Sequence, residues 1–296
     1  MKTKAGYAVI IGKPNAGKST LLNGLLDYKL SIVSPKPQTT RKRVLGIYNN
    51  DDTQIIFFDT PGLLKPKYEM QRSMMNFVNS SLDDADLMVY IQDIAKLELD
   101  KFPDPISKQI FENFKKPKIL ILNKIDLKKD VKETLPLIKK FYDEGTFDQI
   151  VPISAKSKEN LDNVIKAISQ YIPENPFYYD PELLSTEPQR FFVSELIREQ
   201  IFFSFKEEIP YSTEVSILEF KEREKGKWYI HAEIIVERDN QKKILIGKGG
   251  AMIKNIGQYA RKEIEELLGM DVYLEIFVKV RKDWRNNKSH LRSFGY

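Results

Sequence analysis

Apolar and polar positions alternate in two different ways along this chain of 296 residues. Up to about residue 172, short apolar runs are separated by amphipathic segments, which is typical of strands that alternate with helices. The apolar runs predict strands at 7–11, 44–49, 54–58, 87–91, 119–122 and 150–153, and the amphipathic segments predict helices at 18–26, 69–81, 106–114, 131–142 and 160–171. This order predicts an α/β domain with a mostly parallel sheet, helices on both faces and a ligand site at the strands' carboxyl ends.

The pattern changes after a stretch that holds four prolines between residues 172 and 188. Such stretches are extended and stiff, so we place a linker at 176–188, between a first domain at 1–175 and a second at 189–296. The second domain predicts a smaller α+β unit in the order helix, two strands, two helices, strand, at 189–205, 213–220, 228–237, 241–245, 251–268 and 272–280. Gly269 is placed to end the longer of the paired helices.

The residues after the first predicted strand match the phosphate-binding pattern G-x-x-x-x-G-K-[ST]. They are Gly12, Lys13, Pro14, Asn15, Ala16, Gly17, Lys18 and Ser19, followed by Thr20. Glycines let backbone N–H groups converge on phosphate oxygens, and the helix that follows adds the positive end of its dipole. We therefore expect Lys18 to reach the β- and γ-phosphates and the Ser19 hydroxyl to hold Mg²⁺.

Two further motifs fit a nucleotide that is sensed through its γ-phosphate. Asp59, Thr60, Pro61 and Gly62 follow a predicted strand, so that the carboxylate can orient Mg²⁺ through water and the Gly62 N–H can bond the γ-phosphate. The loop after the first helix holds Gln38, Thr39, Thr40 and Arg41, in which a threonine hydroxyl can complete the magnesium shell. These motifs predict a P-loop nucleoside triphosphatase that detects whether the γ-phosphate is present.

The remaining motifs select the base. Asn123, Lys124 and Asp126 follow another strand: Asp126 can accept two N–H bonds that guanine offers and adenine does not, Asn123 braces the loops, and the Lys124 stem covers the base. Ser154, Ala155 and Lys156 follow the last strand, where the Ala155 N–H can meet the guanine oxygen. Each motif is common alone, but together, in order and at strand ends, they predict a GTP site.

A glycine-rich turn marks the second domain. It comprises Ile246, Gly247, Lys248, Gly249 and Gly250 and lies between the two predicted helices. In KH modules such a turn contacts the backbone of about four unpaired nucleotides. We expect Lys242, Lys243, Lys248 and Lys254 to supply charge, and Ile246 and Ile253, with Ile244 and Ile256 as further candidates, to form a floor for the bases.

Composition supports a polyanion partner for this domain and excludes several site types. The net charge is only +5, but residues 241–262 carry six basic residues and no acid. The absence of cysteine excludes disulfides, thiolate zinc sites and cysteine nucleophiles. With no apolar run long enough to span a bilayer, we expect a cytoplasmic protein.

These motifs resemble those of translation-factor-type GTPases, and with the second-domain pattern and the closing residues 291–296 the whole chain resembles the Era family of ribosome-associated GTPases. The resemblance implies GTP hydrolysis through Lys18, Thr40 and Gly62, with Thr40 favoured over Thr39 for Mg²⁺. It implies that Asn15 helps to bind K⁺, and that turnover is slow because Leu63 stands where many GTPases orient water with glutamine. The implied partner is the 3′ end of 16S ribosomal RNA, and the implied role is assembly of the small subunit.

Two other readings stay open. In the first, the protein is a signalling GTPase whose basic ends and aromatic helix at 191–205 contact the inner face of the cell membrane. In the second, it is an RNA-modifying enzyme, although the second domain shows no catalytic group. We expect a monomer in each case.

Overall fold

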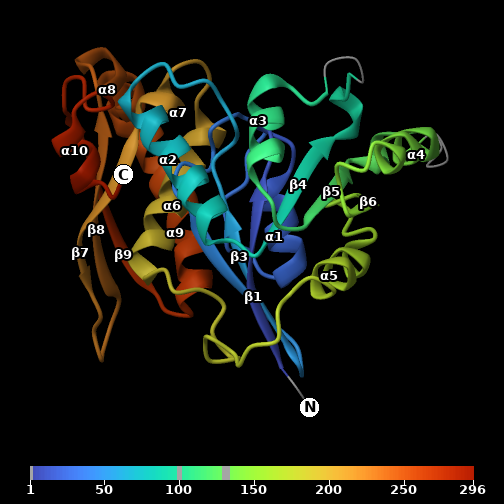
Figure 1. Cartoon of the computed structure of the whole chain (residues 1–296). Helices are drawn as coiled ribbons and strands as arrows, with labels where there is room; N and C mark the ends of the chain where they lie inside the picture. Colours follow the sequence, from blue (N-terminus) through green and yellow to red (C-terminus); the bar gives the residue numbers. More distant parts are fainter. Residues whose placement is uncertain (1–2, 99–101, 129–133) are drawn as a thin grey trace. The chain divides into compact units, whose positions relative to one another are not determined.

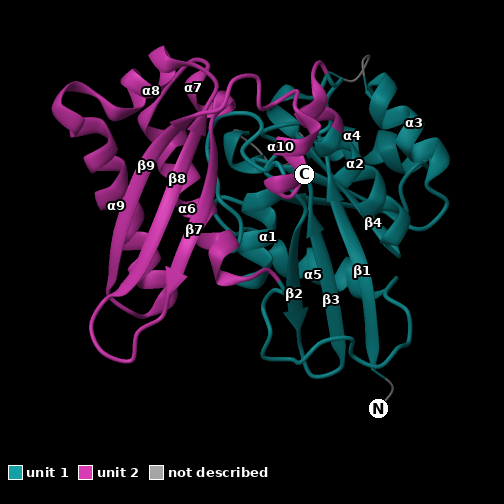
Figure 2. Ribbon diagram, turned by 90° about the vertical axis from the view of Figure 1, so that its left-hand side faces the viewer, with its two compact units in different colours: residues 1–66, 73–186 teal, residues 67–72, 187–296 magenta. Residues whose placement is uncertain are grey.

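The computed structural model describes residues 3–98, 102–128 and 134–296, which divide into two compact units (Figure 2). Unit 1 comprises residues 1–66 and 73–186, and unit 2 comprises 67–72 and 187–296. Much of the predicted linker packs along unit 1: Ile47 N donates to the Leu184 carbonyl oxygen at 2.8 Å, and Gln54 Nε2 donates to that of Tyr179 at 2.9 Å.

Unit 1 is built on a six-stranded sheet in the order β2-β3-β1-β4-β5-β6. Only the β2–β3 pair is antiparallel, so the sheet is mostly parallel, as predicted. The six predicted strands are confirmed as β1 (Lys4–Ile11), β2 (Val44–Asn49), β3 (Thr53–Asp59), β4 (Leu87–Asp93), β5 (Lys118–Asn123) and β6 (Gln149–Ile153).

Helices cover both faces of this sheet (Figure 1). Val78 of α2, Phe111 of α3 and Phe141 of α4 share one apolar cluster with Val9 and Leu120 of the strands, whereas α1 packs against α5 on the other face. The helices are α1 (Lys18–Leu26), α2 (Glu69–Asp84), α3 (Pro105–Asn113), α4 (Leu135–Asp143) and α5 (Leu161–Ser169), with 3₁₀ turns η1 (Ile94–Lys96) and η3 (Ile125–Leu127). The predicted start of the fourth helix at 131 lies outside the described residues.

Unit 2 has a three-stranded sheet in the order β7-β8-β9, in which β8 and β9 are parallel. The predicted order of elements is confirmed as α6 (Gln189–Ser204), β7 (Glu214–Lys221), β8 (Trp228–Val236), α8 (Asp239–Ile246), α9 (Ala251–Leu268) and β9 (Val272–Val280). The structure adds α7 (Ile209–Ser212), η5 (Lys248–Gly250) and α10 (Lys288–Ser293), which are too short to show a helical period in sequence. Gly269 ends α9 in a left-handed conformation, as predicted.

The core of unit 2 lies between α6, α9 and one face of the sheet. Ile197 and Ile201 of α6 and Ile256 of α9 are buried there against the alternate apolar residues of the strands. Ile256 therefore cannot form a floor for bases, and that prediction is wrong. None of the helices that the structure describes is long and apolar enough to cross a membrane.

Candidate functional site

The predicted phosphate loop runs from the end of β1 to the start of α1. Gly17 has a φ of 108°, and a Cβ atom there would lie 2.2 Å from Nδ2 of Asn123, so this position requires glycine. Asn123 donates from the same Nδ2 to the Ala16 carbonyl oxygen at 2.8 Å. The loop is therefore fixed against β5, and α1 adds its first N–H groups and the positive end of its dipole.

Lys18 is buried at the centre of this loop. Its Nζ donates to the carbonyl oxygens of Gly12 at 3.2 Å and Lys13 at 3.1 Å. Burial lowers the pKa of Lys18 to about 8, and the negative charge of Asp59 opposes part of this shift. Phosphate oxygens at the predicted position would favour the charged ammonium group and reverse the effect of burial.

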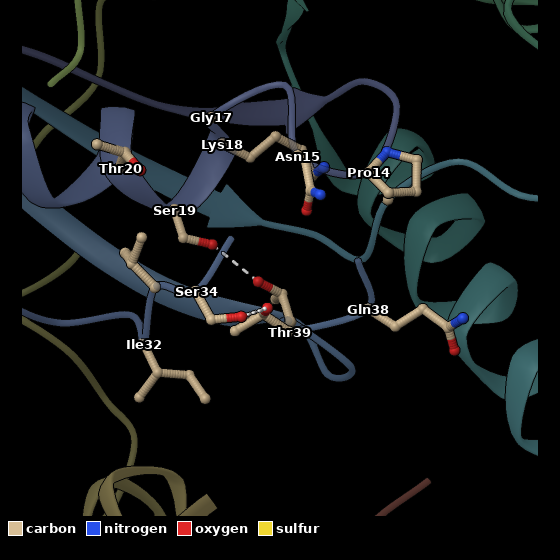
Figure 3. Close-up of a pocket in the computed structure, with 13 residues that line it drawn as sticks. Pro14, Asn15, Gly17, Lys18, Ser19, Thr20, Ile32, Ser34, Gln38 and Thr39 are labelled. Atoms are coloured by element: carbon tan, nitrogen blue, oxygen red, sulfur yellow. Dashed lines mark hydrogen bonds between the residues drawn. The ribbon is translucent and has the colours of Figure 1, made fainter. Parts of the chain in front are cut away.

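Three side-chain oxygens meet beside Lys18, and two of them, those of Ser19 and Thr40, belong to residues that line the pocket of Figure 3. Ser19 Oγ donates to Oδ2 of Asp59 at 2.7 Å and lies 2.8 Å from Oγ1 of Thr40. Burial raises the pKa of Asp59, and the Ser19 hydrogen bond and the Lys18 charge oppose that rise. The Oδ1 atom of Asp59 is buried and accepts no hydrogen bond from the described residues. These oxygen donors fit Mg²⁺.

Thr40, rather than Thr39, belongs to this cluster. The Thr39 hydroxyl donates to the Lys36 carbonyl oxygen at 2.8 Å and lies 2.7 Å from Ser34 Oγ, so it stabilises its own loop (Figure 3). The geometry thus supports the choice of Thr40 as the magnesium ligand.

The segment after β3 lies directly on the phosphate loop. Thr60 Oγ1 donates to the backbone of β1 at 2.7 Å, and Leu63 N donates to the Gly12 carbonyl oxygen at 3.0 Å. A Cβ atom at Gly62 would lie 2.8 Å from three atoms of Pro14, which shows how closely the two segments pack. Leu63 is buried in the core of unit 1 and offers no polar group to a water molecule.

The base-selecting motifs meet at the ends of β5 and β6. Oδ1 of Asn123 accepts a hydrogen bond from Ala155 N at 2.9 Å, so one amide joins the two motifs. Asp126 is exposed and can accept N–H groups from a base edge. Ser154 is buried and its Oγ accepts from the backbone N of the third residue after it at 3.2 Å, while Lys156 is exposed. The structure thus joins the base-selecting motifs to the phosphate loop through Asn123, whereas the pocket itself is lined by residues of the phosphate loop, of the loop at 32–40 and by Gly62.

The glycine-rich turn of unit 2 exposes its backbone. Gly249 and Gly250 have φ angles of 58° and 79°, and a Cβ atom on either would meet nothing within 4 Å. Lys248 and Lys254 are exposed beside it, as are Lys243 and, in part, Lys242. The turn therefore lets a nucleic-acid backbone approach closely.

A groove of about 400 Å³ lies between α9 and β9, next to this turn. Sequence reasoning found two of the residues that line it, Ile253 and Lys254. It missed Gly257, Gln258, Arg261, Leu274 and Ile276. The spacing of 253, 257 and 261 on one helical face is the signal that could have added Gly257 and Arg261 to Ile253. Ile246 is half-buried against the core, and Ile244 is 49% exposed.

Comparisons with known proteins match both units. A model described as 50S ribosome-binding GTPase matches residues 7–124, and a model described as KH domain matches residues 208–285. The GTPase Era of Heliobacterium modesticaldum is 42% identical over 295 residues, covering 100% of this chain and 98% of that protein. The GTPase Era of Lacticaseibacillus paracasei is 44% identical over 296 residues, covering 99% of this chain and 96% of that protein.

Two solved structures are similar over the whole chain. One is Era in complex with MgGDPNP and nucleotides 1506–1542 of 16S ribosomal RNA, and the other is an Aquifex aeolicus Era variant bound to GDP·AlF4⁻. Each has a TM-score of 0.93, is 42% identical in sequence and covers 99% of both chains.

We expect binding of GDP without Mg²⁺ to take up a proton above about pH 8. The free protein holds Lys18 at a pKa of about 8, and the diphosphate raises that pKa in the complex. Affinity should therefore fall by up to about tenfold per pH unit above about pH 8. Calorimetry in two buffers of different ionisation enthalpy measures the uptake, and a chelator keeps divalent metal ions out of the site. Lys18→Arg should abolish the uptake; a parent protein with none would contradict the assignment.

Proposed function

This chain belongs to the Era family of GTPases, and we propose that it binds the 3′ end of 16S ribosomal RNA under the control of its GTP site and acts in small-subunit assembly. The observation that carries the proposal is the joint presence of a complete guanine-nucleotide site and an open glycine turn beside a groove in a chain 42% identical to an Era bound to 16S nucleotides. Neither feature alone would distinguish a signalling GTPase from an RNA-binding module.

GTP hydrolysis on these residues depends on positioning and charge. Lys18 and the N–H groups of the phosphate loop hold the phosphates and stabilise the negative charge that develops in transfer. Ser19, Thr40 and Asp59 would hold Mg²⁺, which supplies a further positive charge against the phosphate oxygens. Because Leu63 is buried and apolar, no side chain orients water from that position, and intrinsic turnover is slow.

RNA recognition would use the turn and the groove differently. The turn at 247–250 offers a backbone without side chains at Gly249 and Gly250 and the ammonium group of Lys248 to a phosphate backbone, and the groove offers apolar side chains from α9 and β9 to unpaired bases. Ile253, Leu274 and Ile276 form its apolar wall, while Lys254 and Arg261 lie beside them. This combination suits single-stranded RNA, whose bases are free to leave a stack.

The segment after the γ-phosphate sensor connects the GTP site directly to unit 2. Residues 67–72 follow the γ-phosphate sensor Gly62 by five positions, yet they belong to unit 2. Within unit 2, Met70 N donates to the Arg285 carbonyl oxygen at 2.9 Å, and the Arg285 guanidinium lies 4.9 Å from the centre of the Tyr68 ring. A displacement of Gly62 when the γ-phosphate is lost would therefore be transmitted along the chain to residues 67–72, which are hydrogen-bonded within unit 2.

We also propose that the protein is a cytoplasmic monomer. Most apolar side chains of α6, including Ile197, Ile201 and Phe202, are buried, which favours RNA over a lipid surface as the partner. Liposome flotation beside RNA filter binding separates the two, and lipid binding without RNA binding would overturn the choice.

We expect K⁺ to accelerate GTP hydrolysis several-fold over Na⁺. Asn15 lines the magnesium pocket, and its Nδ2 is held by the Pro35 carbonyl oxygen at 2.9 Å, which fixes the side chain for a cation ligand role. Hydrolysis rates in matched KCl and NaCl buffers test this, with Asn15→Ala as the variant that should lose the difference. Equal rates of the parent protein in both salts would contradict it.

We expect Lys248→Ala to weaken binding of a 16S 3′-end oligonucleotide by about tenfold and to lower the slope of log K against log[salt] by about 1. The side chain projects from the exposed turn, so its removal should take away one phosphate contact without disturbing the core. Fluorescence anisotropy at several salt concentrations gives both quantities.

Lys225→Ala is the matched control, because this exposed lysine lies in the turn between β7 and β8, at the opposite end of β8 from α8. It should change neither affinity nor slope by more than the general charge effect. Equal losses in the two variants would show that the glycine turn is not the RNA contact.

A further inference from the structure

Asp93 ends β4 and pairs, across the sheet, with Asn123 at the end of β5. Its Oδ2 lies 2.6 Å from Nζ of Lys124, and the two side chains are 7% and 29% exposed. The same Nζ donates to the carbonyl oxygen of Asn15 at 2.9 Å. One lysine thus joins a buried carboxylate to the phosphate loop from within the base-selecting motif.

The residues that this lysine joins need to be held. Lys124 and Asn15 have φ angles of 72° and 62°, in the left-handed region that side chains with a Cβ rarely adopt. A partly buried ion pair with a 2.6 Å hydrogen bond is stronger than a fully exposed pair and can help to maintain such a backbone. From Asn15 the contacts continue to the Pro35 carbonyl oxygen, in the loop that carries Thr40.

We propose that Asp93 is a positioning residue for the guanine nucleotide. Its carboxylate holds Lys124 extended between the base-selecting motif and the phosphate loop, so that the lysine stem covers the bound base and the two loops do not separate. The consequence is slow dissociation of GDP and GTP. This inference depends on nucleotide binding by the family and not on the RNA proposal.

The two oxygens of Asp93 have separable tasks. Oδ1 accepts a hydrogen bond from Ala95 N at 3.0 Å and caps η1, which is a structural role. Oδ2 contacts Lys124. Asp93→Asn keeps an oxygen for Ala95 and removes the charge that holds the lysine, so it tests the second task alone.

A double-mutant cycle on nucleotide dissociation tests the proposal. The variants are Asp93→Asn, Lys124→Met and both together, and the measured quantity is the dissociation rate constant of fluorescent GDP from the full-length protein. We expect each single change to raise the rate about tenfold, as befits loss of one charge-assisted bond. The double variant should equal either single variant, because Asp93 acts through Lys124. The temperature midpoint of the nucleotide-free protein should stay close to that of the parent for Asp93→Asn.

Asp104→Asn is the matched control. Asp104 also pairs with a lysine of the phosphate loop, Lys13, but at 3.4 Å and with the lysine 51% exposed. It should leave GDP dissociation within about twofold of the parent. The proposal is overturned if Asp93→Asn does the same, or if the effects of Asp93→Asn and Lys124→Met multiply in the double variant.

Should Asp93→Asn fail to fold, two variants of Lys124 test the proposal instead. Lys124→Arg retains a cation within reach of Asp93, so it should release GDP more slowly than Lys124→Met. Equal rates for these two variants overturn the proposal.

Discussion

The side-chain amide of Asn123 joins the three loops on which nucleotide binding depends. Its Nδ2 donates to Ala16 of the phosphate loop at 2.8 Å, and its Oδ1 accepts from Ala155 at 2.9 Å. Both groups are buried, and leaving either unpaired would cost about 1–3 kcal/mol. Gly17 has no side chain because this amide occupies the space. Phosphate recognition and base recognition are therefore parts of one rigid frame, formed before the nucleotide arrives.

The segments that sense the γ-phosphate also contact this frame. Thr40 meets Ser19 through a pair of hydroxyl groups, and the segment after β3 packs on Pro14 at Gly62 and donates from Leu63 N to the Gly12 carbonyl oxygen. In unit 2, by contrast, the space beside the backbone is open at Gly249 and Gly250 of the glycine turn. A nucleotide site held together by Asn123, sensor segments in contact with it and an open turn in unit 2 fit a GTP-controlled switch better than an enzyme optimised for turnover.

The position of each motif at a strand's carboxyl end allowed much of this to be predicted from sequence. Parallel strands bring such ends together, so the sequence alone predicts that Asp59, Asn123 and Ala155 lie near one another. The sequence does not single out Asp93, because a lone carboxylate after an apolar run belongs to no motif with a fixed spacing. Its role appears only once β4 is known to lie beside β5.

The groove that we propose for RNA bases is less predictable from the sequence, for a reason that lies in α9. Residues 256, 260 and 264 form its buried face, whereas 253, 257 and 261 face the groove. Sequence reasoning assigned Ile253 and Ile256 to the same surface, although three positions place them about 60° apart on a helix and tertiary packing decides between them. The residues that β9 contributes to the groove cannot be predicted from the sequence, because alternation along a strand shows two faces but not which face borders a ligand.

The central claim is that the nucleotide in unit 1 sets the RNA affinity of unit 2. The most direct measurement is the dissociation constant of a 16S 3′-end oligonucleotide for the full-length protein loaded with GDP and with a non-hydrolysable GTP analogue, at one salt concentration. The account predicts that the two constants differ by at least about fivefold, the lower end of ordinary allosteric coupling. Equal constants would contradict it.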